Sequence, residues 1–135
     1  MIRLSKKIEY AILAVQYISR NPSRLISAKE IAENLNISFE FLSKALQKLI
    51  QSGIVSSRQG AKGGYSLSRP AHEVSIEDII RAIDENTAIV ECFEHGQGES
   101  CGRTDECTLR SPIGKIQQEI NSILRKTTIA DLTRN

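Results

Sequence analysis

The chain has 135 residues, of which 40% are hydrophobic and 4% aromatic, and it contains no tryptophan. This length allows one domain with a mainly aliphatic core and, at most, one appended element. No apolar run approaches the length of a membrane span, and Glu9 and Gln16 interrupt the N-terminal stretch too early for a signal peptide. We therefore expect a cytoplasmic protein with no membrane partner.

The net charge of +2 hides an uneven distribution. Residues 1–70 hold 11 Lys and Arg against four Asp and Glu, whereas residues 71–135 hold seven against 12. A basic first half suits a polyanionic partner such as nucleic acid, although a moderate charge can also serve solubility alone.

The first predicted element is a helix over residues 5–20. Apolar side chains recur there at helical spacing, at Ile8, Ile12, Val15 and Ile18, and Asn21-Pro22 ends the pattern. We expect this helix to pack beneath the elements that follow it. Glu9 lies off the apolar stripe, and its default interpretation is a solvated acid.

Residues 27–53 predict two helices separated by a tight turn. Ser27 with Glu30 three residues later is typical of a capping box, and the Asn-rich stretch 34–36 disfavours continuation of that helix. Ser38 caps a longer second helix, and Gly53 suits the left-handed residue that ends it. This order predicts a helix-turn-helix, in which the second helix enters the DNA major groove.

A glycine-rich hairpin follows directly and predicts a wing. Residues 54–58 and 65–68 have the pattern of two strands, and the turn 59–64 contains three glycines that are free to adopt positive φ. We expect Gln47 and Ser43 to read bases, Glu40 to accept from cytosine or to repel other bases, and the cations to attract phosphate or the minor groove. The candidate DNA-binding residues are Ser38, Phe39, Glu40, Ser43, Lys44, Gln47, Lys48, Arg58 and Lys62.

Two further helices are predicted beyond the wing. Ser75 with Asp78 begins one, whose isoleucines face the core and which ends near residues 84–86. Ser111-Pro112 begins the other, and a short seam of apolar residues runs along it: Ile113, Ile116, Ile120, Ile123, Leu124 and Thr127. Two heptads are too few for an isolated coiled coil, so the seam packs either on its own domain or on a two-fold mate. We expect a homodimer through residues 112–127, with one further helical turn from 128 to 131.

Between these helices, residues 87–110 form a polar stretch without periodicity that contains Cys92, Cys101 and Cys107. Three cysteines in a cytosolic chain do not make a disulfide scaffold, and their spacing lacks the short pairs of common zinc sites. The residues themselves leave two interpretations open, namely a metal or cluster site and three unligated thiols.

The whole pattern resembles the IscR/NsrR/CymR family of bacterial winged-helix transcription regulators. The resemblance covers nearly the whole chain, and its most specific part combines the glycine-rich wing with the three late cysteines. The matching residues are Arg3-Leu4-Ser5, Tyr10-Ala11, residues 28–32, Leu42, Leu46, Leu49, Gly53, Val55, Gly60, Gly63-Gly64-Tyr65, Leu67 and residues 75–83.

The resemblance implies an iron–sulfur cluster, [2Fe-2S] or [4Fe-4S], on Cys92, Cys101 and Cys107, and a dimer formed through the long C-terminal helix. This chain departs from the IscR-like pattern, because Arg110, which cannot ligate, stands where those members carry a ligating histidine. Glu9 matches the carboxylate that NsrR-like members supply from the partner subunit. His95, Glu106 and an exogenous small ligand are the alternatives for the fourth position.

These observations predict a mainly α fold with a small β wing, a winged helix-turn-helix with a long C-terminal dimerisation helix. The expected divisions are a DNA-binding domain over residues 1–86, a sensor loop over 87–110, and a dimerisation helix and tail over 111–135. Two alternatives are a cluster-free regulator that signals through a protein partner, zinc or thiol redox, and a protein-interaction module that carries a metal or a cluster. An enzyme is not expected, because neither His72 nor His95 has a partner in a catalytic motif.

Overall fold

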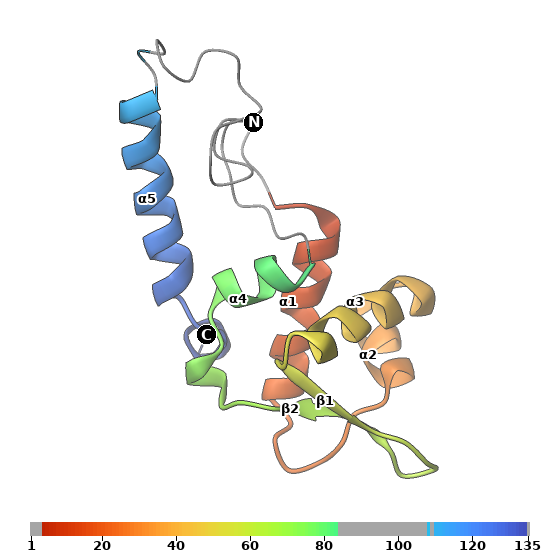
Figure 1. Cartoon of the computed structure of the whole chain (residues 1–135). Helices are drawn as coiled ribbons and strands as arrows, with labels where there is room; N and C mark the ends of the chain where they lie inside the picture. Colours follow the sequence, from red (N-terminus) through yellow and green to blue (C-terminus); the bar gives the residue numbers. More distant parts are fainter. Residues whose placement is uncertain (1–3, 84–107, 109, 135) are drawn as a thin grey trace.

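The structure, a computed structural model, describes residues 4–83, 108 and 110–134 (Figure 1). It confirms a mainly helical fold with one two-stranded antiparallel sheet. The elements in chain order are α1 (Lys6–Ser19), α2 (Ala28–Leu35), α3 (Phe39–Gln51), β1 (Val55–Arg58), β2 (Gly64–Leu67), the 3-10 helix η1 (Ala71–Glu73), α4 (Ile76–Ile83), α5 (Arg110–Lys126) and α6 (Ile129–Thr133). None of the helices in the described ranges has the length and apolar character needed to cross a membrane.

Helix α1 lies at the centre of the N-terminal part, where it contacts α3, α4 and α6. Ser5 caps its first turn by accepting a hydrogen bond from the backbone N–H of Ile8. Ala11, Ala14 and Val15 are completely buried, which gives α1 the small side chains that allow neighbouring helices to approach closely. This arrangement confirms the expectation that the first helix packs beneath the helix-turn-helix.

The wing is a regular antiparallel pair in which Val55 lies opposite Leu67 and Arg58 lies opposite Gly64. It is attached to the strand-like segment before α2, because Tyr65 and Ile26 exchange two backbone hydrogen bonds with N–O distances of 2.8 and 3.1 Å. The wing therefore holds a fixed position relative to the start of α2.

Helix α4 begins with the predicted capping box. The backbone N–H of Ser75 donates to the Asp78 carboxylate at 3.0 Å, and that of Asp78 donates to the Ser75 hydroxyl at 3.1 Å.

The segment between α5 and α6 pairs with the residues at the start of α4. Ile76 N–H donates to the carbonyl of Thr127, and Ile129 N–H donates to that of Val74, both at 2.9 Å.

The C-terminal helix α6 completes the core of the N-terminal part. Ile129 is completely buried, and the Gln16 side chain on α1 donates to the carbonyl of Leu132 at 3.0 Å. A full capping box formed by Thr128 and Asp131 starts this helix, which extends the single turn expected from the sequence to Thr133.

Helix α5 lies beside α4 at the edge of the molecule, and its C-terminal end leads into α6 (Figure 1). It begins at Arg110, so Ser111 lies inside the first turn instead of capping it, as the sequence had suggested. Leu124 packs against the core, whereas Ile116 and Ile123 on the same seam are 47% and 63% exposed. Much of the predicted seam is thus not covered by the described part of its own chain.

Candidate nucleic-acid interface

The turn between α2 and α3 has the geometry that a helix-turn-helix requires. Asn36 ends α2 in the left-handed conformation, with φ of 54°, and its side-chain type tolerates this conformation better than most. Ile37 follows and is buried, which anchors the turn. Ser38 then caps α3 by accepting from the N–H of Phe41 at 3.2 Å.

Helix α3 has one buried and one exposed face. Leu42, Ala45, Leu46 and Leu49 form the buried face. The opposite face presents Glu40, Lys44 and Gln47, all exposed, with Phe39 at the start of the helix 56% exposed and Ser43 partly buried at its side. The structure therefore places the predicted base-reading side chains on one accessible surface.

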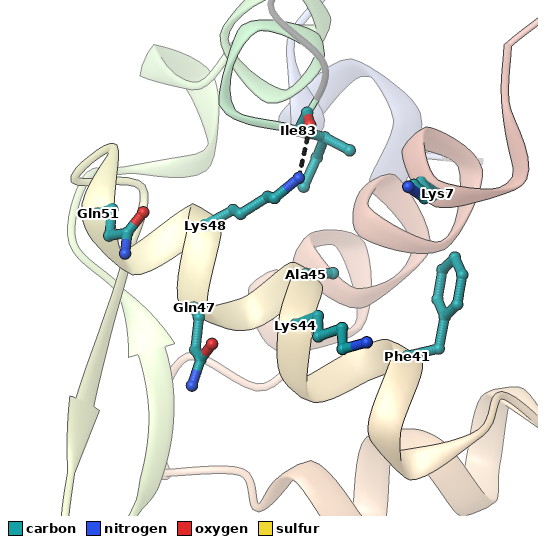
Figure 2. Close-up of a pocket in the computed structure, with 8 residues that line it drawn as sticks. All are labelled: Lys7, Phe41, Lys44, Ala45, Gln47, Lys48, Gln51 and Ile83. Atoms are coloured by element: carbon teal, nitrogen blue, oxygen red, sulfur yellow. Dashed lines mark hydrogen bonds between the residues drawn. The ribbon is translucent and has the colours of Figure 1, made fainter.

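Lys48 lies at the edge of this surface. Its Nζ donates a hydrogen bond to the carbonyl of Ile83, the last residue of α4, at 3.1 Å (Figure 2). A lysine at a helix C-terminus also interacts favourably with the helix dipole. Lys48 thus connects α3 to the end of α4, a contact that the sequence did not predict.

The wing presents Arg58 at the end of β1 and Lys62 in the turn, and both side chains are exposed. Two of its three glycines have positive φ, 114° at Gly60 and 157° at Gly64.

The third glycine, Gly63, does not have the positive φ that the sequence allowed. A side chain is excluded at Gly63 because other backbone atoms approach it closely. A Cβ on Gly63 would lie 2.1 Å from the Arg58 carbonyl oxygen, and one on Gly64 would lie 2.8 Å from the backbone of Ile26.

The start of α2 is held by a three-residue network. Ser27 accepts from the N–H of Glu30 at 3.1 Å, but the Glu30 carboxylate does not complete the predicted capping box. Instead it accepts from Tyr17 on α1 at 2.8 Å and from both terminal nitrogens of Arg24 at 2.8 and 2.6 Å. The hydrogen bonds from Arg24 and then Tyr17 lower the pKa of Glu30 from 4.5 to about 2. Folding brings these donors to Glu30, and the hydrogen bonds from the charged Arg24 are stronger than one from a neutral backbone N–H.

The predicted metal ligands divide between two parts of the chain. Cys92, Cys101 and Cys107, together with His95 and Glu106, lie outside the described residues. Glu9 lies in the first turns of α1, 42% exposed, with its Oε2 2.9 Å from Lys6 Nζ. Within the described ranges, no group of three metal-binding side chains comes together.

Two features of this surface escaped sequence reasoning. Ile26 anchors the wing through its backbone, which no side-chain pattern reports. Lys7 on α1 lines the same pocket as Phe41, Lys44 and Lys48 of α3, although it is far from them in the sequence. The sequence carries no local signal for this position of Lys7, because it depends on how α1 packs against α3.

The helix-turn-helix followed by an anchored wing defines a winged-helix DNA-binding protein. More narrowly, the chain belongs to the Rrf2 family of transcriptional regulators, because the family model, described as iron-dependent transcriptional regulator, matches residues 4–135. The relatives in this family are transcriptional regulators and not enzymes. This confirms the expectation from the sequence that the protein is not an enzyme.

Related proteins of known sequence support this assignment. Protein aau3 of Rhizobium meliloti is 34% identical over 133 residues, which cover 98% of this chain and 86% of that protein. The transcriptional regulator NsrR of Oceanobacillus iheyensis is 31% identical over 135 residues, covering 99% and 91%.

Solved structures agree with the sequence relatives. CymR, the global cysteine regulator of B. subtilis, has a TM-score of 0.81 at 26% identity and covers 99% of this chain and 98% of its own. IscR of T. potens has a TM-score of 0.78, also at 26% identity, with coverage of 98% and 87%. The resemblance to the IscR/NsrR/CymR group is therefore confirmed.

Proposed function

We propose that this protein is a homodimeric transcriptional regulator whose affinity for double-stranded DNA is controlled by an iron–sulfur cluster. The observation that carries the DNA-binding part is the exposed face of α3, with Glu40, Lys44 and Gln47 beside a wing that bears Arg58 and Lys62. Gln47 and Ser43 would read base edges, and the cations would attract phosphate or enter the minor groove.

The dimer is inferred from α5. Ile116 and Ile123 leave a large apolar area exposed on a helix that carries mostly polar residues elsewhere. Helices with such a seam gain stability by burying it against a partner. A two-fold mate on residues 112–127 would present two α3 helices to successive major grooves, about one helical turn apart.

The signal is inferred from the donor set between α4 and α5. Three thiolates suit an iron–sulfur cluster, [2Fe-2S] or [4Fe-4S], and the description of the family as iron-dependent agrees with iron chemistry. Glu9 of the partner subunit is our candidate for the remaining ligand. Its ion pair with Lys6 is exposed, so exchanging that pair for a metal costs little.

The proposed division into a DNA-binding domain, a sensor loop and a dimerisation helix would couple cluster binding to DNA binding. A cluster on Cys92, Cys101 and Cys107 would lie in the chain between the reading helix and the dimer helix. If it fixes the angle between the two heads of the dimer, cluster and DNA must each alter the affinity of the protein for the other.

A cluster-free regulator is the second candidate. Arg110 stands where a ligating histidine would be expected, and the structure resembles that of CymR, whose description names cysteine regulation. In this case the thiols would serve redox chemistry, bind zinc or take no part.

Anaerobic purification with iron and sulfide analysis and an absorption spectrum tests the proposal. We expect a coloured protein with matched iron and sulfide, loss of the cluster in Cys101→Ser, and a different affinity of cluster-loaded and cluster-free protein for a duplex selected from random sequences. A protein that stays iron-free after anaerobic reconstitution would overturn cluster control and favour the second candidate. A weak oxygen ligand such as Glu9 would leave one iron open to nitric oxide, so an unchanged spectrum and an unchanged reaction with nitric oxide in Glu9→Ala would exclude Glu9 as a ligand.

A further inference from the structure

A hollow of about 290 Å³ lies between α1, α3 and the end of α4 (Figure 2). Phe41 and Ala45 form part of its wall, and Ile83 closes the end nearest α4. Polar side chains of α1 and α3 complete the lining: Lys7, Lys44, Gln47, Lys48 and Gln51.

The described residues that line this hollow carry only positive charge. Lys7, Lys44 and Lys48 contribute three ammonium groups, and no Asp or Glu is among the residues that line it. Glu40 lies one turn from Lys44, but no ion pair joins them in the described structure. Among the described residues, Lys7 and Lys44 likewise form no ion pair with a carboxylate.

Lys48 is held in place at this site. Its hydrogen bond to the Ile83 carbonyl uses one of the three N–H groups of the ammonium and leaves two for another acceptor. Gln47 and Gln51 supply amide N–H groups on the same helix. Three cations with amide donors around one hollow match the oxygen acceptors and the charge of a phosphate diester.

The position of the hollow identifies the source of that phosphate. Lys44 and Gln47 belong both to its lining and to the exposed face of α3 that we assign to the major groove. A DNA strand bordering that groove would therefore pass along the edge of α3 at which Lys7 lies.

We propose that Lys7, Lys44 and Lys48 bind a backbone phosphate beside the major groove entered by α3, which makes α1 part of the DNA interface. This inference rests on the proposed function, since it assumes that α3 is the reading helix. A free phosphate ion offers the same oxygen atoms, so the test must distinguish the two sources.

Lys7→Gln is the informative variant, and Lys6→Gln is its matched control. The two lysines are adjacent on α1 and lose the same charge, but Lys6 is paired with Glu9 and does not line the hollow. Affinity for a duplex selected with the wild-type protein, and for a scrambled duplex of equal length, is measured over a series of salt concentrations.

We expect Lys7→Gln to weaken binding to both duplexes by a similar factor, about three- to tenfold near physiological salt, because a phosphate contact carries no sequence information. The slope of log K against log salt should fall in magnitude by about 1 relative to Lys6→Gln. Circular dichroism should show the same fold in both variants.

Equal affinity and equal salt slope of the two variants would overturn the inference while leaving the regulator proposal intact. Lys7→Gln could also abolish saturable competition by inorganic phosphate for the protein while leaving its DNA affinity unchanged. That result would overturn the inference in favour of a site for a small anion. Failure of the wild-type protein to select any duplex would instead contradict the proposed function itself.

Discussion

Glu77 of α4 and Arg125 of α5 form an ion pair across the contact between these two helices, with 3.1 Å between Oε2 and Nε. The Glu77 side chain is only 7% exposed, and its other oxygen lies 3.1 Å from Arg81. Because α4 belongs to the N-terminal core and α5 carries the proposed dimer seam, this carboxylate fixes the direction in which α5 leaves the core.

Glu77→Ala should lower the free energy of unfolding by about 1–2 kcal/mol, because it removes two charge-assisted hydrogen bonds from a buried acceptor. Chemical denaturation of the dimer at fixed concentration measures the change. Glu73→Ala, which removes an exposed carboxylate, is the control and should change stability by less than about 0.5 kcal/mol. Similar values for the two variants would show that Glu77 does not stabilise the contact between α4 and α5.

Ile129→Ala should cost about 2–4 kcal/mol of stability, since Ile129 is completely buried between α6 and the rest of the core. Thermal and urea unfolding check this value. Leu13→Ala is the comparison, because Leu13 is 39% exposed on α1 and its truncation leaves a smaller cavity. If Ile129→Ala were as stable as the wild type, α6 would not be part of the cooperative core.

Gly63→Ala should disrupt the wing more than Gly60→Ala. A Cβ at Gly63 would overlap the Arg58 backbone oxygen and force the turn to rearrange, whereas one at Gly60 meets no atom within 4 Å and costs only about 1–2 kcal/mol of local strain at positive φ. DNA affinity and the heteronuclear NMR spectrum of residues 55–67 measure the difference. Full DNA affinity in Gly63→Ala would exclude a role for the wing conformation in binding.

Stability should depend on pH through Glu30. Because the folded protein lowers the pKa of this carboxyl from 4.5 to about 2, its contribution is present above about pH 4.5 and is lost as the pH falls toward 2. The difference in unfolding free energy between wild type and Glu30→Gln should therefore shrink over this range. Arg24→Gln, which removes the strongest cause of the lowered pKa, should reduce the same dependence. A difference that stays constant over this range would contradict the effect.

The double variant Ile116→Glu with Ile123→Glu should convert the dimer to a monomer, because two charges would have to be buried in the proposed interface. Analytical ultracentrifugation measures the mass. Gln118→Glu adds a charge to an exposed position elsewhere on α5 and should leave the dimer intact. A monomeric wild type, or a dimer that persists in the double variant, would place the interface elsewhere or remove it.

The sequence by itself determined the elements whose cause is local. Ser5, Ser38 and the Ser75–Asp78 pair begin helices because their side chains satisfy N–H groups three residues away. The Asn-rich stretch 34–36 ends a helix because Asn side chains compete for the backbone, and Gly53 ends the next one because it tolerates a left-handed conformation; Asn36 and Gly53 both have positive φ. The order of these signals also identified the winged helix-turn-helix and the family.

Tertiary structure decided what depends on groups far apart in the chain. Glu30 carries the signature of a capping box, yet Tyr17 and Arg24 take its carboxylate because the folded chain brings stronger donors to it. Gly63 is required by an approaching carbonyl and not by its own φ, and Lys7 reaches the edge of α3 only through helix packing. Local backbone preferences can be read from neighbouring residues, whereas these contacts exist only once the core has set the distances between its helices.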